Sequence, residues 1–135
     1  MSACVLDASA LVAAAIDTGA DGRWSEDLVL SRDLVAPEIV LAEATNILRR
    51  LESAGRLDTT AASLALRDVM ALDLELCSFA PFAPRVWELR RNVTAYDAWY
   101  VAVAEALELP LATLDLRLVR SSGPRCEFLH RRALG

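Results

Sequence analysis

The chain has 135 residues, 55% of them hydrophobic, with five Gly, five Pro and a net charge of −5. This length and composition predict a single domain, 1–135, with a substantial core, and they exclude a disordered chain. The apolar runs are far too short to span a bilayer and no signal-like segment opens the chain, so we expect a cytoplasmic protein without membrane association.

The first half of the chain alternates short apolar runs with helical patterns. Pro37 is favourable in the first turn of a long helix, and Gly55 is a suitable stop for it. The predicted elements are a strand over 2–6, a helix over 8–16, a loop over 17–22, a helix over 23–31, a strand over 33–36 and a helix over 37–54.

The second half repeats this alternation. Asp58-Thr59 predicts the cap of the next helix, and Pro84 is tolerable because it lies in a first turn. The predicted elements are a helix over 60–72, a strand over 75–78, a helix over 81–91, a buried helix from 95, a buried strand over 109–114, a helical turn over 115–119 and a strand over 125–129. The core should cover about 3–129, leaving a short C-terminal tail, 130–135.

Strands that alternate with helices predict an α/β fold, with a mostly parallel sheet covered by helices on both faces. In such sheets ligands bind at the carboxyl ends of the strands. Asp7 and Asp115 each stand at the carboxyl end of a predicted strand. If these two strands are neighbours the carboxylates meet, but the sequence alone does not show that adjacency.

Four acids at the ends or edges of apolar segments need an explanation, and each has a structural alternative. Asp7 and Asp115 could cap the helical segments that follow them. Asp97 forms a capping box with Thr94, three residues earlier. Glu43 lies at the border of the apolar face of its helix and could simply reach solvent.

Taken together, the four acids indicate a metal site. Two carboxylates about 4 Å apart repel by roughly 4 kcal/mol at an effective dielectric near 20, so converging acids need a cation. Mg²⁺ or Mn²⁺ prefers such oxygen ligands. The four acids account for −4 of the net charge, so metal binding would leave the rest near neutral and remove an objection to binding nucleic acid.

Other chemistries lack their residues. All 14 basic residues are Arg, which excludes a Walker phosphate loop and a lysine-dependent receiver domain. His130 is the only histidine, and its place near the C-terminus is poor for a general base. Hydrolysis of a phosphodiester by a metal-activated water remains.

The sequence resembles the PIN-domain ribonucleases, and among them the VapC-type toxins of type II toxin–antitoxin systems. The similarity covers about residues 3 to 129. Its most specific part is the Thr-Ala-Tyr-Asp helix start with a second Asp eighteen residues after Asp97. The matching strings are Val5-Leu-Asp-Ala-Ser-Ala-Leu-Val, Ala36-Pro-Glu to Glu43, Val86 to Ala102 and Leu111-Ala-Thr-Leu-Asp-Leu-Arg-Leu.

This resemblance implies a three-layer α/β/α PIN fold and Mg²⁺- or Mn²⁺-dependent cleavage of RNA. The family's acidic positions, which are catalytic and metal-binding, fall on Asp7, Glu43, Asp97 and Asp115. Ser9 and Thr113 match hydroxyl positions near the metal and rank as secondary. Some relatives carry a further acid where this chain has 116–118, so the number of metal ions stays open. The resemblance also implies a homodimer and a VapB-type antitoxin that covers the active site.

Three hypotheses follow. The first is a metal-dependent endoribonuclease toxin, the second a catalytically silent domain that binds a partner protein, and the third a PIN nuclease that processes RNA without being a toxin. Arg90, Arg91, Arg117 and Arg120 flank the motif and could hold RNA phosphates, or they could be solvated arginines on helix faces. The RNA target leaves no readable code in the sequence.

Overall fold

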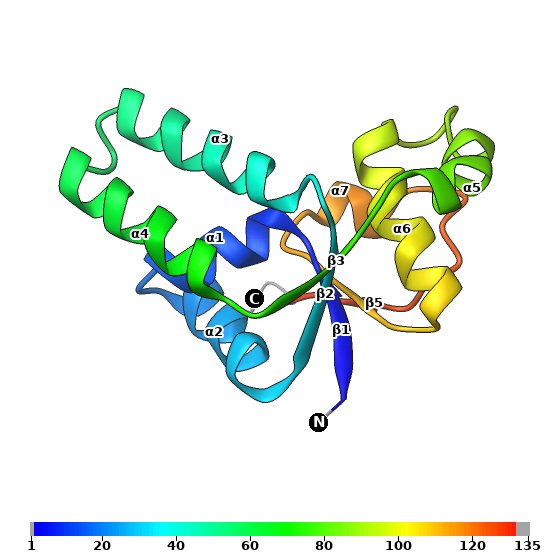
Figure 1. Cartoon of the computed structure of the whole chain (residues 1–135), viewed down its shortest axis with the longest axis horizontal. Coiled ribbons are helices and arrows are strands. Elements are labelled where there is room, and N and C mark those ends of the chain that lie inside the picture. The colour runs from blue at the N-terminus through cyan, green and yellow to red at the C-terminus, as the bar shows by residue number, and fades with distance from the viewer. Residues whose placement is uncertain (1, 132–135) are drawn as a thin grey trace.

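A computed structural model describes residues 2–131. Its five strands form one sheet in the order β3-β2-β1-β4-β5, and every neighbouring pair is parallel (Figure 1). This confirms the predicted α/β fold with a parallel sheet. The strands are β1 (Ala3–Leu6), β2 (Asp33–Pro37), β3 (Leu74–Cys77), β4 (Leu111–Ala112) and β5 (Phe128–Leu129).

Helices cover both faces of this sheet. In Figure 1, α1 to α4 lie on one side of the strands, and α5 and α6 lie on the other. This arrangement confirms the three-layer architecture. None of the helices in residues 2–131 is long and apolar enough to cross a membrane. The helices are α1 (Ala8–Ile16), α2 (Ala20–Ser31), α3 (Val40–Ser53), α4 (Thr59–Ala71), the short 3₁₀ helix η1 (Ala80–Phe82), α5 (Ala83–Glu88), α6 (Ala95–Leu107) and α7 (Leu116–Val119).

The central strand β1 positions the functional end of the molecule. It lies between β2 and β4, and its Cys4, Val5 and Leu6 are buried, as expected for a strand covered on both faces. The backbone N–H of Asp7 still donates to the carbonyl of Ala112, at 3.1 Å. Strands one and four are therefore neighbours, which is the adjacency that brings Asp7 close to the chain after β4.

The predicted helix signals are confirmed at three ends. The side chains of Asp58 and Thr94 cap α4 and α6 by accepting from the N–H groups of Ala61 and Asp97. The long helix α3 ends at Ser53, and Gly55 follows its C-cap, Ala54, with a φ of 74° that lets the N–H of Arg56 reach the carbonyl of Leu51. These local hydrogen bonds explain why the ends were readable from the sequence.

Two helix starts were predicted wrongly in the N-terminal half. Pro37 does not open α3; it is the last residue of β2, opposite Cys77, and the helix begins at Val40. Helix α2 begins at Ala20 rather than at Arg23, and it includes Gly22. A Cβ at Gly22 would lie 1.7 Å from the carbonyl oxygen of Asp17, so the glycine allows a close helix approach rather than marking a loop.

Several elements in the C-terminal half are shorter than predicted. The helix expected over 81–91 is divided into η1 and α5, followed by turns, and the strand expected over 125–129 is only Phe128–Leu129. Of the predicted tail, Arg131 bonds to Asp21 on α2 at 2.7 Å. Residue 1 and residues 132–135 lie outside the described part of the chain.

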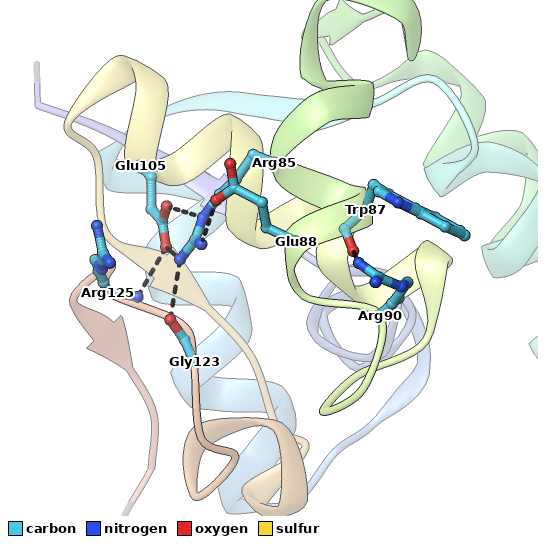
Figure 2. A network of polar contacts seen from close by, with 7 residues as sticks. All are labelled: Arg85, Trp87, Glu88, Arg90, Glu105, Gly123 and Arg125. Atoms are coloured by element: carbon cyan, nitrogen blue, oxygen red, sulfur yellow. Dashed lines mark hydrogen bonds and ion pairs between the residues drawn. The ribbon is translucent and has the colours of Figure 1, made fainter.

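One polar network holds the loop before β5 against α5 and α6 (Figure 2). The guanidinium of Arg85 donates to both carboxylate oxygens of Glu105, at 2.8 and 3.2 Å, to Glu88, and to the carbonyl of Gly123. Glu105 also accepts from the backbone N–H of Arg125, at 2.7 Å. Each charge in this network has an opposite partner, so its role is structural.

Candidate active site

The four predicted acids come together in one hollow at the carboxyl ends of the strands. Asp7 follows β1, Glu43 lies in the first turn of α3, Asp97 in the first turn of α6, and Asp115 opens α7. All four line a cavity of about 200 Å³. Segments that are far apart in sequence therefore deliver four carboxyl groups to one place, and no ion pair neutralises any of them within residues 2–131.

Asp7 is the most buried of the four, with 8% of its surface exposed. It caps α1, since its Oδ1 accepts from the N–H of Ala10 at 3.1 Å and from the Ser9 hydroxyl at 2.6 Å. Its Oδ2 accepts from the Thr113 hydroxyl. Burial raises the pKa of the Asp7 carboxyl to about 6, against the opposing effect of these hydrogen bonds. Capping and participation in the site are thus compatible roles.

Ser9 and Thr113 connect the two central segments of the site. The Ser9 hydroxyl accepts from the N–H of Leu114 at 3.2 Å while it donates to Asp7. The Thr113 hydroxyl, which is fully buried, accepts from the N–H of Asp115 at 2.9 Å while it donates to Asp7. Both predicted secondary residues therefore lie beside the acids and fix the orientation of Asp7.

Glu43 is held by a residue that the sequence interpretation missed. The hydroxyl of Tyr100, a buried side chain of α6, donates to Oε1 of Glu43 at 2.6 Å. Burial raises the pKa of Glu43 and the charge of Asp97 adds to this, while the hydrogen bond from Tyr100 opposes it. Glu43 thus points into the hollow, not away into solvent.

Asp97 takes part in the cap of α6 and also in the acidic site. Its backbone N–H donates to the Thr94 hydroxyl at 3.2 Å, which fixes the start of α6. Its carboxylate lines the hollow, where burial raises its pKa and the charge of Asp115 raises it further. The Thr94 hydroxyl and the Arg117 charge act in the opposite direction.

Asp115 belongs to two hollows. It caps α7 by accepting from the N–H of Arg117 at 3.0 Å. Together with Asp97 it also lines a second hollow of about 270 Å³, whose lining includes Asn92 and Arg117. The second hollow therefore adjoins the first along a pair of carboxylates.

The four predicted arginines are placed differently. Arg117 lines the second hollow. Arg90 lies over the Trp87 ring, 4.3 Å from its centroid, and donates to the carbonyl of Trp87. Arg91 and Arg120 are exposed and line neither hollow. A contact of these side chains with RNA phosphates stays a prediction.

Three further polar residues line the first hollow: Asn46, Arg50 and Tyr100. The signals for them were present in the sequence. Asn46 and Arg50 follow Glu43 by three and seven residues, which places them on the same face of α3, and Tyr100 follows Asp97 by three on α6. The sequence interpretation assigned roles to acids, hydroxyl residues and flanking arginines, and it assigned none to Asn46, Arg50 or Tyr100.

The donor set fits a hard divalent cation, because it offers carboxylate oxygens and no sulfur or imidazole. The pKa values of Asp7, Glu43 and Asp97 are raised because burial outweighs the hydrogen bonds and charges that favour their ionised forms. Within residues 2–131, however, no three His, Cys, Asp or Glu side chains are arranged to hold an ion already. Mg²⁺ is usually bound by one or two carboxylates together with water and substrate oxygens, so a site for it does not require three protein ligands.

Comparisons with known proteins identify the family of this chain. Residues 4–123 match the model of the PIN domain family. Ribonuclease VapC1 of Mycobacterium tuberculosis is 38% identical over 95% of this chain and 97% of its own length. Ribonuclease VapC9 of the same species is 37% identical over 90% of this chain and 93% of its own length. The chain belongs to the PIN-domain family, and within it to the VapC ribonucleases.

A solved structure supports the fold independently. The crystal structure of VapBC2 from Rickettsia felis, bound to a DNA fragment from their promoter, matches with a TM-score of 0.67. The match covers 95% of this chain and 98% of that chain at 18% sequence identity. At this identity the likeness concerns the fold, and it agrees with the three layers described above.

Proposed function

We propose that this protein is a VapC-type toxin that hydrolyses RNA phosphodiester bonds as an endoribonuclease dependent on Mg²⁺ or Mn²⁺. One observation carries the proposal: four carboxyl groups from four distant segments line one hollow, and no cation of the described chain pairs with them. The names of the VapC relatives support the ribonuclease activity. The metal dependence rests on the donor set alone.

Asp7, Glu43, Asp97 and Asp115 are the residues that would hold the metal. When bound there, a divalent ion supplies an activated water and stabilises the charge that develops on the phosphate. The chain itself contributes orientation. Ser9 and Thr113 keep both oxygens of Asp7 in place, and Tyr100 does the same for Glu43. Partial burial keeps bulk water from the acids, which strengthens their interaction with a cation.

We further propose a VapB-type antitoxin as partner, a homodimer as the assembled toxin, and the cytoplasm as the place of action. The solved VapBC2 pair supports the first of these. Exposed apolar side chains on α2 and α4, among them Leu30, Leu64 and Met70, offer surface for protein contacts. Light scattering on the isolated chain and on the chain purified with the product of a neighbouring small gene tests both assemblies.

RNA cleavage by the purified protein tests the nuclease function. With Mg²⁺ or Mn²⁺ the wild-type chain should cut RNA, EDTA should stop the reaction, and Asp7→Asn should lack it while it keeps its fold. Arg67→Gln is the control, because Arg67 is exposed on α4 and lines neither hollow. Cleavage that survives in Asp7→Asn would show that the site is wrongly assigned.

Mapping of new 5′ ends in cellular RNA after induction tests the toxin role and reveals the target. Growth arrest with a restricted set of new ends, both absent in Asp7→Asn, is the result expected of a toxin. Cleavage without growth arrest would favour an RNA-processing nuclease instead. Absence of both cleavage and metal binding would favour a silent domain that binds a partner protein.

A further inference from the structure

The two hollows described above form one path across the surface. Asp97 and Asp115 line both of them, so the second hollow begins where the first ends. The first extends toward the C-terminal half of α3, and the second toward the turn before α6 and the end of α7. A chain laid along both would pass over all four acids.

Each end of this path carries one arginine. Arg50, in the last turn of α3, lines the first hollow, and Arg117, in α7, lines the second. Both side chains are exposed, and neither takes part in an ion pair within residues 2–131. Each of the two adjoining hollows thus has one guanidinium group without an ion pair in the described chain, which is available to an anionic ligand.

Three other arginines of the described chain have partners in the fold. Arg85 is bound to Glu105, Glu88 and the Gly123 carbonyl, and Arg90 lies on the Trp87 ring and the Trp87 carbonyl (Figure 2). Arg131 is paired with Asp21. Neither Arg50 nor Arg117 has such an attachment through its guanidinium, which distinguishes them from the structural arginines.

We propose that Arg50 and Arg117 bind RNA phosphates on opposite sides of the bond to be cut, so that a single strand runs from the α3 end of the first hollow to the α7 end of the second. This inference rests on the proposed function. A phosphate at the acids needs a metal ion, but its neighbours along the strand lie beyond the acids and still meet their negative field. A guanidinium at each end offsets that repulsion and offers paired donors to phosphate oxygens.

The second hollow adds neutral donors and acceptors beside Arg117. Asn92, Thr94 and Ser121 line it. The Thr94 hydroxyl accepts from the N–H of Asp97 and can still donate, and the Ser121 hydroxyl donates to the carbonyl of Leu118 and can still accept. The Asn92 amide makes no side-chain hydrogen bond within the described residues, whereas Oδ1 of Asn46 in the first hollow accepts from Arg49. The α7 end therefore has the residues to bind a nucleotide, and the α3 end mainly those to bind a phosphate.

Salt dependence of binding tests this path. A short, fluorescent single-stranded RNA, whose phosphorothioate linkages resist cleavage, is titrated with protein in Mg²⁺, with the wild-type acids as the common background. For a single strand, the slope of log K against log salt becomes shallower by about 0.7 for each phosphate that the protein no longer neutralises. Arg50→Gln and Arg117→Gln should therefore each flatten the slope by about that amount, and the double variant should flatten it about twice as much.

Arg67→Gln in the same background is the matched control, since it removes the same charge from an exposed position on α4. Its slope should equal that of the background protein. Equal slopes for Arg50→Gln, Arg117→Gln and this control would overturn the path, and so would a double variant no different from one single variant. If wild-type protein cuts RNA in the same preparation, such a result refutes the path alone and leaves the nuclease function standing.

Discussion

Two polar clusters of this protein use the same kinds of side chains in opposite ways. The Arg85–Glu105 network joins α5, α6 and the loop before β5, and its charges compensate one another (Figure 2). The acidic hollow joins β1, α3, α6 and α7, and contains four acids without an ion pair in the described chain. The first cluster is complete by itself, whereas the second calls for a cation from outside.

The pKa values express this difference. Burial alone would raise the pKa of Glu105, yet the hydrogen bonds from Arg85 and from the Arg125 backbone outweigh it and lower the pKa. In the hollow, burial raises the pKa of Asp7, Glu43 and Asp97, and hydrogen bonds from neutral hydroxyls do not cancel the effect. An uncompensated carboxylate is a cost in stability that metal binding can recover.

Helix α6 contributes one acid to each cluster, and this allows the sharpest contrast. Asp97→Asn should lower RNA cleavage by at least about 100-fold, since even an outer-shell partner of a metal costs 10–100-fold when it is removed. Its thermal stability without metal should not fall, because the variant removes a carboxylate that is repelled by Asp115. Cleavage rates and thermal melts of the same preparation provide both values.

Glu105→Gln is the counterpart on the same helix. It should leave the cleavage rate unchanged and lower the free energy of unfolding, because Arg85 and the Arg125 N–H lose their acceptor's charge. If Glu105→Gln lost cleavage while Asp97→Asn kept it, the division into a structural and a functional cluster would be wrong.

The metal-free protein should be most sensitive to pH at Asp7. Its folded pKa of about 6 lies above the ordinary value of 3.8, so ionised Asp7 destabilises the fold. The penalty is absent below about pH 4 and fully present above about pH 6, where it amounts to roughly 3 kcal/mol. In EDTA, Asp7→Asn should therefore gain stability over wild type as the pH rises from 4 to 7, as measured by urea unfolding.

Mg²⁺ should reduce this difference between Asp7→Asn and the wild type at neutral pH, since only the wild type regains compensation for the charge. If the stability difference between Asp7→Asn and the wild type did not change with pH in EDTA, Asp7 would have an ordinary pKa in the folded protein. If the stability advantage of Asp7→Asn over the wild type became smaller as the pH rises, the folded pKa of Asp7 would be lowered and not raised.

Tyr100→Phe tests the support of Glu43. The variant keeps the ring in the core and removes only the hydroxyl that donates to Oε1 of Glu43. We expect about a 10–100-fold loss of metal affinity, the range found for outer-shell partners. Calorimetry with Mn²⁺ measures it. Tyr96→Phe is the control, since Tyr96 is exposed on the same helix, and an equal effect of both changes would refute the role of Tyr100.

Arg85→Gln should have the smallest of these effects. Its partners are partly buried, with 18% of the Glu105 side chain exposed, so we expect a loss of about 1–2 kcal/mol, between the values for surface and buried pairs. The contribution is present above the ordinary pKa of Glu105 and is lost as the pH falls through its lowered folded value. Urea unfolding at pH 7 and at pH 3 should show that the stability advantage of the wild type over Arg85→Gln becomes smaller on acidification. At Asp7, by contrast, acidification should remove a disadvantage of the wild type.

The sequence was sufficient for the parts that depend on local or pairwise signals. Caps at Asp58 and Thr94 and the stop at Gly55 use hydrogen bonds within a few residues, so they could be predicted. The alternation of elements was sufficient for the layers. The four acids stood out because carboxylates are rare beside apolar segments unless something compensates them.

The remainder depends on contacts between distant segments. Pro37 looked like a helix start because its strand partner, Cys77, is forty residues away. The adjacency of β1 and β4, on which the site depends, is set by packing of the whole sheet. The helix period places Tyr100 on the same face of α6 as Asp97, but neither segment shows that its hydroxyl bonds to Glu43, because that bond joins two helices far apart in the sequence.

Calorimetric titration with Mn²⁺ tests the central claim most directly, because it asks whether the acidic hollow takes up the missing cation. The wild-type protein at neutral pH should bind Mn²⁺ at millimolar concentrations or below and gain thermal stability. Asp7→Asn should lose most of the heat, whereas Glu105→Gln should keep it. Absence of binding to the wild type at millimolar Mn²⁺, or equal binding to Asp7→Asn, would contradict the claim.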